Sequence, residues 1–191
     1  MIYETIIIST DPQSHPHIAP FGVREQEGMV VIAPFRPSST LDNLLSRRVA
    51  TMNAVDDVRI FAGALTDHRS WPVHQAEKID GFFMDDALAH RELELVRVEE
   101  DAVRPLLYFR VVHEVNHRAF RGFNRAQAAV IELSVLVSRL HMLPMEKIET
   151  EMAYLSIAIE KTAGVRERQA WDWLVERIGN YKANLSGDNL A

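Results

Sequence analysis

The sequence predicts an α+β protein in which an antiparallel β lobe is followed by a lobe of three helices. Apolar and polar residues alternate in short runs through about the first 115 residues, and after Gly122 the apolar residues recur with the helical period of 3.6. The chain has 191 residues, of which 47% are hydrophobic and 25% are charged. This composition is typical of a folded protein and excludes a disordered chain, a collagen and a coiled coil.

Six segments of the first lobe have the composition of β-strands. Tyr3 to Thr10 is apolar and β-branched, and turn residues separate it from the runs that follow. Glu92 to Val98 and Leu106 to Val115 alternate strictly, which predicts a hairpin. The six predicted strands cover residues 3–10, 17–23, 29–35, 49–55, 92–98 and 106–115.

The segments between these strands are of three kinds. Ser39 or Thr40 is a good N-cap for a short helix that ends near Arg47, where basic residues suit the helix dipole. Val58 to Leu65 is apolar enough to form either a strand or a short helix. Thr66 to His90 has no sustained period, which predicts a surface loop of a length that is often functional.

Three helices are expected in the second lobe. Pro144 opens the second of them, and Gly164 is a candidate C-cap residue. The predicted helices cover residues 124–142, 144–162 and about 166–182, and the apolar face of the first holds Ala128, Ile131, Val135 and Leu136. The predicted domains are therefore a β lobe over 1–117, a helical lobe over 118–184 and a frayed tail over 185–191.

Charge and cysteine content exclude several classes of protein. The chain has 21 basic and 27 acidic residues, a net charge of −6, which argues against a nucleic-acid binder. It has no cysteine, so it has no disulfide framework, thiolate metal site or cysteine nucleophile. We expect a cytoplasmic protein with no signal peptide and no membrane contact, because no apolar run approaches the length of a membrane span.

One local motif suggests a zinc hydrolase. The residues HEVNH, which include His113, Glu114 and His117, fit the pattern H-E-x-x-H. That pattern binds zinc on a helix, where positions i and i+4 share one face. Here the preceding residues alternate as in a strand, and two positions four residues apart in a strand lie about 13 Å from each other. The motif is therefore expected to be the polar end of a strand, with a zinc hydrolase as a remote alternative, and we predict no metal site. Rossmann, P-loop and serine-hydrolase motifs are absent from the sequence.

A second pattern predicts an anion site. The segment APFRPSSTLDNL places an arginine at the end of a strand and hydroxyl residues at a helix N-terminus, where free backbone N–H groups and the helix dipole favour a phosphate. A plain capping turn with a solvated arginine explains the pattern equally well. The candidate residues are Arg36, Ser38, Ser39, Thr40 and Asn43.

A cluster of basic residues lies between the two predicted lobes. Arg118, Arg121 and Arg125 fall within eight residues, with Asn124 among them. Arginine in the first turn of a helix opposes the helix dipole. We therefore expect an anion, a carboxylate or a neighbouring subunit to contact this cluster, the alternative being a solvated helix start.

Together these segments resemble a known family. HIAPFGV (17–23), VIAPFRPSSTLDNLL with Asn53 in the strand after it, GFNRAQAAVIE (122–132) and EKTAG (160–164) are similar to an uncharacterised prokaryotic family of FMN-binding split-barrel proteins. That family belongs to the wider superfamily of flavin reductases and pyridoxamine-phosphate oxidases. The resemblance covers almost the whole chain, and GFNRAQAAVIE is the segment most specific to the smaller family.

The resemblance implies a six-stranded Greek-key split barrel with a helical C-terminal lobe, and a homodimer that binds FMN across its subunit interface. It places the FMN phosphate at Arg36, Ser38, Ser39, Thr40 and Asn43. It places the flavin ring at Asn53 and at the strand residues Ile18, Ala19, Pro20, Phe21 and Gly22. Arg121, Asn124 and Arg125 match the family motif, and contacts with the ring, the phosphate or the second subunit are all open for them. Many relatives have a lysine near the phosphate that this turn lacks, so affinity is expected to depend on Arg36.

The resemblance also implies a flavin-dependent oxidoreductase with an unknown small-molecule electron donor or acceptor, and a link to pterin-dependent one-carbon metabolism. A flavin carries out the electron transfer itself, so no catalytic motif is needed and no catalytic residue is predicted. The alternative is a protein that binds a flavin or another small ligand without turnover.

Overall fold

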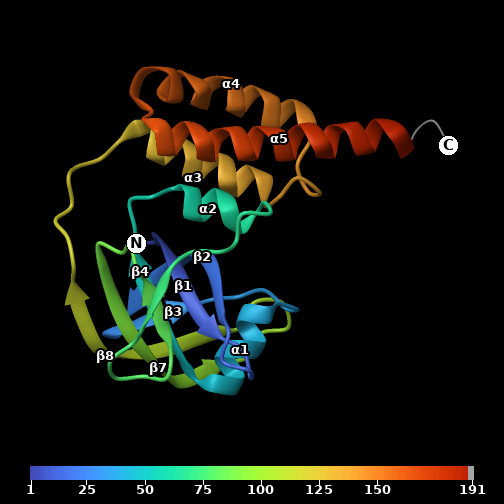
Figure 1. Cartoon of the computed structure of the whole chain (residues 1–191). Coiled ribbons are helices and arrows are strands. Elements are labelled where there is room, and N and C mark those ends of the chain that lie inside the picture. The colour runs from blue at the N-terminus through green and yellow to red at the C-terminus, as the bar shows by residue number, and fades with distance from the viewer. Residues whose placement is uncertain (189–191) are drawn as a thin grey trace. The chain divides into compact units, whose positions relative to one another are not determined.

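The computed structural model describes residues 1–188, with side chains to residue 185, and its contacts divide the chain into two compact units. The barrel unit comprises residues 1–56 and 71–120, and the helical unit comprises residues 57–70 and those from 121 onward (Figure 1). Residues 57–70, which the sequence placed in the β lobe, join the helical unit because Val58 and Ala62 are buried in its core.

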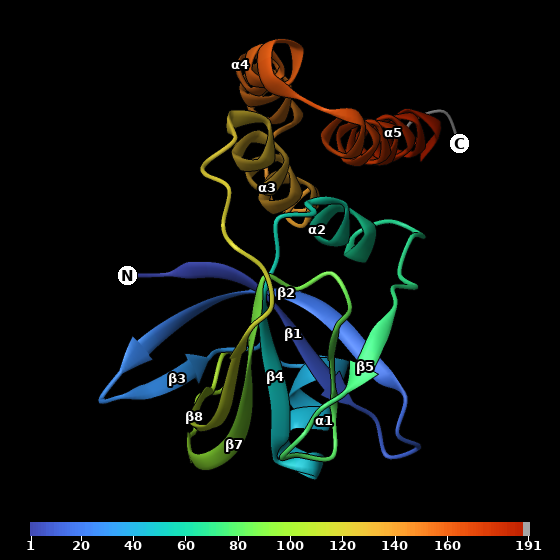
Figure 2. The same cartoon turned by 60° about the vertical axis from the view of Figure 1, so that its left-hand side comes forward.

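Six strands of the barrel unit form one closed barrel in the order β1-β2-β3-β8-β7-β4 (Figure 2). Every neighbouring pair is antiparallel. The six strands predicted from alternation are these six, and the α+β barrel with its helical region is confirmed. Their bounds are β1 (Tyr3–Thr10), β2 (Pro16–Gln26), β3 (Met29–Ile32), β4 (Val49–Ala54), β7 (Ala89–Glu99) and β8 (Leu106–Asn116).

The barrel encloses a core of alternate apolar residues, which is what the period of two requires of a strand that faces a core on one side. Helix α1 (Ser39–Arg47) adds Leu41 and Leu44 to this core. The turn between β2 and β3 is Glu27-Gly28, where both residues have positive φ, 56° and 74°. Two positive φ angles suit the right-handed twist of a two-residue hairpin, and they favour glycine. The core residues are Ile7, Val23, Val30, Ile32, Leu41, Leu44, Ala50, Leu93, Leu95, Leu107 and Phe109.

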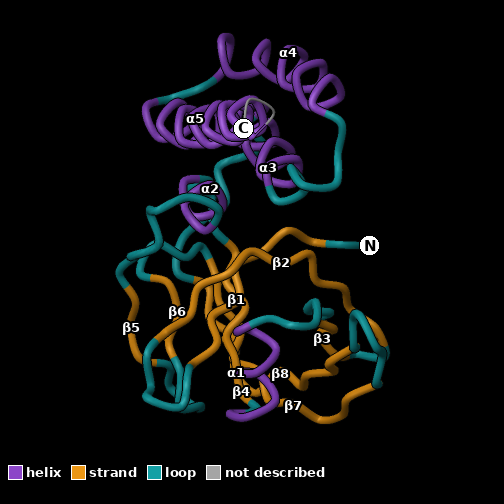
Figure 3. Tube along the Cα trace, turned by 90° about the vertical axis from the view of Figure 1, so that its right-hand side faces the viewer, coloured by secondary structure: helices purple, strands orange, loops and turns teal. Residues whose placement is uncertain are grey.

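The predicted surface loop over 66–90 contains a second, two-stranded sheet. It consists of β5 (Val73–Gln75) and β6 (Phe82–Met84), which pair antiparallel beside the barrel strands (Figure 3). Each strand has only three residues, which is too short for alternation to reveal. Thr51 on β4 donates a hydrogen bond to the Phe82 carbonyl at 2.6 Å, and this bond holds β6 against the barrel.

In the helical unit, the residues described up to 188 form four helices around one apolar core. Val58 to Leu65, which the sequence left open, contains a helix. Asp57 accepts hydrogen bonds from the Arg59 backbone N–H (3.1 Å) and from the Arg59 guanidinium, which fixes the start of that helix. The helices are α2 (Arg59–Ala64), α3 (Arg125–Val137), α4 (Met145–Thr162) and α5 (Val165–Asp188).

Several predictions for the helical unit need correction. Of the predicted face of α3, Leu136 is buried and Ile131 packs against the core, but Ala128 is exposed. The buried residues of this helix also include Ala126, Val130 and Leu133, which the prediction left out. Gly164 does not cap α4 with a left-handed conformation. Its backbone N–H donates to the Glu167 carboxylate at 2.9 Å, so it begins α5.

The predicted tail also differs, since α5 continues through residue 188, and the remaining three residues of that tail lie outside the described part of the chain. None of the helices described for residues 1–188 combines the length and the apolar character that a membrane crossing requires.

Candidate functional site

The sequence predicts an anion site at the N-terminus of α1. Ser38 is the N-cap residue and accepts a hydrogen bond from the Leu41 backbone N–H at 3.3 Å, so the cap lies one residue before the predicted Ser39. Within residues 1–188 no protein group hydrogen-bonds to the hydroxyl of Ser39 or Thr40. The backbone N–H groups of Ser39 and Thr40 occupy the first turn, where no intrahelical acceptor exists. Hydroxyls and N–H groups that folding does not use are available to a phosphate.

A hollow of about 390 Å³ lies beside this helix end. The His15 ring lies 3.1 Å from the Asp11 carboxylate. The His15 backbone N–H also donates to Asp11, and this bond is the main reason that the pKa of Asp11 is lowered. Asn43 is 7% exposed, and its amide donates to the Ser9 hydroxyl on β1 at 3.2 Å. The residues that line the hollow are Asp11, His15, Pro16, His17, Ser39, Asp42 and Asn43.

Arg36 points to the turn between β7 and β8. Its guanidinium lies 2.6 Å from the Glu100 carboxylate, and its Nε donates to the Asp101 carbonyl at 3.3 Å. A second cation that sequence reasoning missed lies close by. Arg104 donates to the Ala33 carbonyl at 2.8 Å, and its guanidinium lies 4.8 Å from the centre of the Phe35 ring. The sequence gives no signal for Arg104, because only the pairing of β3 with β8 brings it to this turn.

The predicted ring-contact residues lie on two strands that both pair with β1. Ile18 to Gly22 are half-buried on β2, and β2 pairs with β3 only from Arg24 onward. Among the described strands, none pairs with the second edge of residues 16–23. A strand edge of this kind leaves N–H and C=O groups for a ligand or a second chain.

Asn53 has a structural role in the barrel. It is 0% exposed, its amide nitrogen donates to the Ile6 carbonyl (3.2 Å) and the Thr51 hydroxyl (3.0 Å), and its oxygen accepts from the Met84 N–H (2.9 Å). Asn53 therefore joins β1, β4 and β6, and a ring contact through it stays a prediction.

The basic cluster divides between the two units. Arg118 belongs to the barrel unit, where it lies 2.9 Å from the Asp86 carboxylate. Arg121, Asn124 and Arg125 belong to the helical unit. Asn124 is the N-cap of α3: its oxygen accepts from the Ala126 N–H at 2.7 Å and its nitrogen donates to the Thr162 carbonyl at 3.1 Å. A role of these three residues in FMN binding stays a prediction.

The HEVNH motif lies on a strand, as its alternation indicates. His113 and Glu114 are in β8 and His117 follows it, so the helical geometry of a zinc hydrolase is not formed. Glu114 binds the Arg91 guanidinium at 2.9 Å, while His117 lies 2.8 Å from His90 on β7. In the described part of the chain, no group of three or more His, Cys, Asp or Glu residues could hold a metal ion. The contact between His117 and His90 was not predicted.

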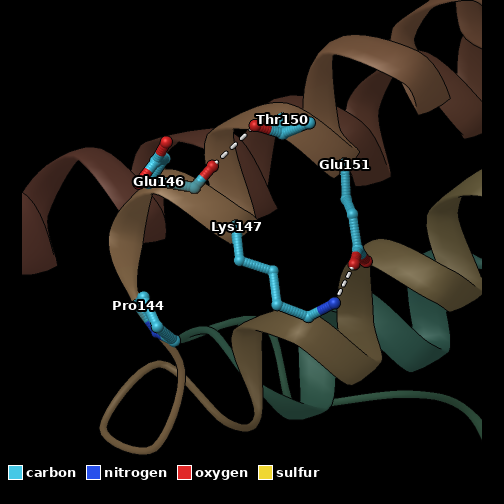
Figure 4. Close-up of a pocket in the computed structure, with 5 residues that line it drawn as sticks. All are labelled: Pro144, Glu146, Lys147, Thr150 and Glu151. Atoms are coloured by element: carbon cyan, nitrogen blue, oxygen red, sulfur yellow. Dashed lines mark hydrogen bonds and ion pairs between the residues drawn. The ribbon is translucent and has the colours of Figure 1, made fainter.

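Two larger hollows offer less specific chemistry. One of about 400 Å³ lies over α4, where Lys147 pairs with Glu151 and the Thr150 hydroxyl donates to the Glu146 carbonyl at 2.8 Å (Figure 4). Its polar groups thus bind one another. The other, of about 490 Å³, lies in the barrel unit beside His90 and Arg91, and Arg91 is paired with Glu25 and Glu114.

Comparison of the sequence with models of protein families identifies the family of this chain. A model described as "Protein of unknown function (DUF447) N-terminal domain" matches residues 3–118, and one described as "Protein of unknown function (DUF447)" matches residues 124–176. A search of curated protein sequences returned no match.

Solved structures share the fold at low sequence identity. An FMN-bound protein from Methanosarcina mazei that is assigned to the DUF447 family superimposes with a TM-score of 0.81 and 20% identity, over 92% of this chain and 94% of that one. The 2-nitrobenzoate 2-nitroreductase of Pseudomonas fluorescens has a TM-score of 0.51 and 18% identity, over 60% of this chain and 64% of that one. An FMN-binding protein from Thermus thermophilus with bound p-hydroxybenzaldehyde has a TM-score of 0.51 and 14% identity, over 60% of this chain and 71% of that one. The fold is therefore one that flavin-binding proteins share.

Proposed function

Since this chain belongs to the DUF447 family of proteins of unknown function, we propose that it is a flavoprotein that binds FMN in its barrel unit and uses it in an oxidation–reduction reaction. The observation that carries the proposal is the N-terminus of α1, where the hydroxyls and backbone N–H groups of Ser39 and Thr40 are free of protein partners among the described residues. The FMN-bound relative from Methanosarcina mazei has the same fold over nearly its whole length, which supports FMN as the ligand.

The residues present fit a flavin phosphate. Ser39 and Thr40 would hold it with hydroxyl and N–H donors, and the helix dipole adds about 0.3 to 1 kcal/mol. Arg36 and Arg104 lie on the turns next to this helix end and would supply positive charge. The bound FMN would supply the electron transfer, so the protein needs to bind and orient it and no catalytic motif is required.

The unpaired edge of β2 fits the rest of the proposal. Ile18 to Gly22 present half-buried side chains there, and their second edge pairs with none of the described strands. We propose that this edge meets the flavin ring and a second subunit, which gives a homodimer with FMN at the interface. Sedimentation at micromolar concentration tests the dimer, and a monomer would contradict it. The cytoplasmic location and the link to pterin-dependent one-carbon metabolism stay predictions.

The decisive experiment is an absorption spectrum of the purified protein between about 300 and 550 nm, before and after incubation with FMN and desalting. Retained flavin bands are the expected result, and a colourless protein that takes up no FMN would overturn the proposal. Anaerobic addition of pyridine nucleotides then separates an oxidoreductase, whose flavin bands bleach, from a protein that binds flavin without turnover.

A further inference from the structure

A buried histidine in the barrel unit joins a carboxylate to a surface histidine. His90 on β7 is 3% exposed, and its ring stacks on Phe83 of β6 with centroids 4.1 Å apart and planes within 4°. Its Nδ1 lies 2.8 Å from Nε2 of His117, which is exposed. Its Nε2 lies 3.5 Å from the Glu92 carboxylate, at the long end of hydrogen-bond distance. Phe83 also stacks on His117, with centroids 5.2 Å apart, and keeps the two imidazole rings nearly coplanar.

Glu92 is held as an anion inside the fold. It is 0% exposed, and its two oxygens accept backbone N–H groups from Glu77 (2.7 Å), Lys78 (2.7 Å) and Ile79 (3.0 Å). Burial alone would raise the pKa of Glu92, but these N–H donors and His90 together lower it. Glu92 therefore carries its negative charge at neutral pH, and no lysine or arginine side chain described in the structure forms an ion pair with it.

The charge of Glu92 determines which ring nitrogens carry protons. With Glu92 ionised, Nε2 of neutral His90 carries the proton and faces the carboxylate. Nδ1 of His90 is then an acceptor, so the short contact requires that Nε2 of His117 donates to it. This leaves Nδ1 of His117 as the nitrogen that can take a proton. The positive charge that results is joined to the negative charge of Glu92 through the His90 ring.

Most other charged groups around the cluster have partners of their own. Nε2 of His113 lies 3.3 Å from the Glu77 carboxylate but is buried without a hydrogen-bond partner among the described residues, and its ring meets His90 edge to face with centroids 6.3 Å apart. His74 on β5 pairs with Asp85. Lys78 pairs with Glu77 at 2.7 Å, and Arg118, the residue after His117, pairs with Asp86. None of these ion pairs interrupts the chain of contacts from Glu92 through His90 to His117.

The cluster lies in the same row of the barrel as the predicted ring-contact residues. Asn53 on β4 stands directly opposite His90, Ile6 on β1 stands opposite Asn53, and Pro20 on β2 stands opposite Ile6. Residues directly opposite one another in antiparallel strands project from the same face of the sheet. His90 therefore belongs to the face of the barrel that also carries Pro20 of the unpaired β2 edge, and His117 contacts His90 from the segment after β8.

We propose that Glu92, His90 and His117 form a proton relay, in which His117 exchanges a proton with the molecule that the flavin reduces or oxidises. Glu92 and His90 are positioning residues, because they act through His117. This step rests on the proposed function. In the reducing direction, bound FMN would supply the acceptor with a hydride, that is, two electrons and one proton. His117, which has first taken a proton from water at Nδ1, gives that proton to a second atom of the acceptor and returns to its neutral Nε2–H form. The substrate class is an organic acceptor that takes up a hydride and a separate proton, such as a quinone.

The relay itself can be tested without FMN. In the full-length protein labelled with an NMR-active nitrogen isotope in histidine, we expect the Nε2–H tautomer for both His90 and His117 at neutral pH. In Glu92→Gln the amide can turn its N–H₂ toward His90, so the His90 tautomer should change and that of His117 should change with it. His113→Gln is the matched control, because His113 touches the cluster but is outside the chain of contacts. Tautomers that do not respond to Glu92→Gln would overturn the relay.

The role of His117 is tested with two acceptors and FMN-loaded protein that has been photoreduced without oxygen. Para-benzoquinone takes up electrons and protons, whereas ferricyanide takes up electrons alone. We expect His117→Gln to slow the reduction of the quinone about tenfold or more and to leave ferricyanide unchanged, with His113→Gln slowing neither. Equal effects on both acceptors, or a wild type that does not reduce the quinone, would overturn this role. Failure to load FMN would overturn the proposed function and leave the NMR result standing.

Discussion

The Arg36 guanidinium lies 2.6 Å from the Glu100 carboxylate, so the arginine predicted to bind phosphate is paired with an acid from the turn between β7 and β8. The pair is exposed, and such pairs contribute about 0 to 1 kcal/mol. If FMN competes for Arg36, Glu100→Gln should strengthen FMN binding by up to about fivefold, equal to about 1 kcal/mol. Titration by flavin fluorescence measures this. Glu94→Gln, an exposed acid paired with Arg110, is the control for the change in net charge. Weaker binding in Glu100→Gln would show that the pair positions Arg36.

Removing the phosphate donors should have the opposite effect. Arg36→Ala combined with Thr40→Ala should weaken FMN binding by about 2 to 4 kcal/mol, because a charge-assisted and a neutral hydrogen bond are both lost. The same fluorescence titration measures the change. Circular dichroism of the variant checks that α1 still packs, since Thr40 is 4% exposed. Unchanged affinity would place the phosphate elsewhere.

Glu92 should hold the segment between β5 and β6 in place. Glu92→Gln replaces a carboxylate that accepts three backbone N–H groups with an amide that has one oxygen. Hydrogen bonds to charged groups are worth about 1.5 to 3 kcal/mol each, so amide hydrogen exchange at Glu77, Lys78 and Ile79 should accelerate by about tenfold or more. If these three amides exchange as fast in Glu92→Gln as in the wild type, Glu92 does not hold this segment in place. Glu94→Gln, on the same strand, is the control and should leave the exchange of these amides unchanged.

Asn124 should matter for stability irrespective of any ligand. Its side chain caps α3 and also bonds the end of α4, so Asn124→Ala should lower the free energy of unfolding of the helical unit by about 1 to 2 kcal/mol. Asn124→Asp retains the oxygen that accepts the capping hydrogen bond, so it should lower the free energy of unfolding by less than Asn124→Ala does. Arg121→Ala and Arg125→Ala remove exposed side chains and should change stability by less than about 0.5 kcal/mol. Urea denaturation followed by circular dichroism distinguishes these cases. If only FMN affinity falls in Asn124→Ala, the residue is a ligand and not a cap.

The sequence pattern predicted the features that depend on residues close together in the chain, namely the strands of the barrel and the start of α1. Tyr3–Thr10 is visible as an apolar, β-branched run because its last six residues are all buried, and Leu106–Asn116 is visible through its alternation. The N-terminus of α1 is visible because caps need hydroxyl residues. Phe82–Met84 was missed because three residues cannot show a period. The pairing of His90 with His117 was missed because it depends on the register of β7 with β8, across 27 residues of sequence. Asn53 was interpreted as a ring contact, and only the structure reveals its bonds to β1 and β6.

The buried histidine should make stability depend on pH. Burial lowers the pKa of His90 below its ordinary value of 6.5, against the opposing effect of Glu92, and the charge of His117 lowers it further. The unfolded chain therefore binds a proton at this residue at a higher pH than the folded chain does. The stability contributed by neutral His90 is complete above pH 6.5 and is lost as the pH falls through the pKa of the folded state.

Urea unfolding of the wild type and His90→Gln between about pH 7 and pH 5 measures this effect, because no other side-chain type titrates there at its ordinary pKa. The free energy of unfolding should fall more steeply with acidification in the wild type than in His90→Gln, whatever their difference at neutral pH. His15→Gln is the matched control, because His15 is exposed and lies outside the cluster around His90. Parallel curves for wild type and His90→Gln would mean that His90 takes up its proton equally in both states. A buried neutral ring that only packs against Phe83, without a link to Glu92, would lose stability still more steeply on acidification, since the opposing charge of Glu92 would be absent.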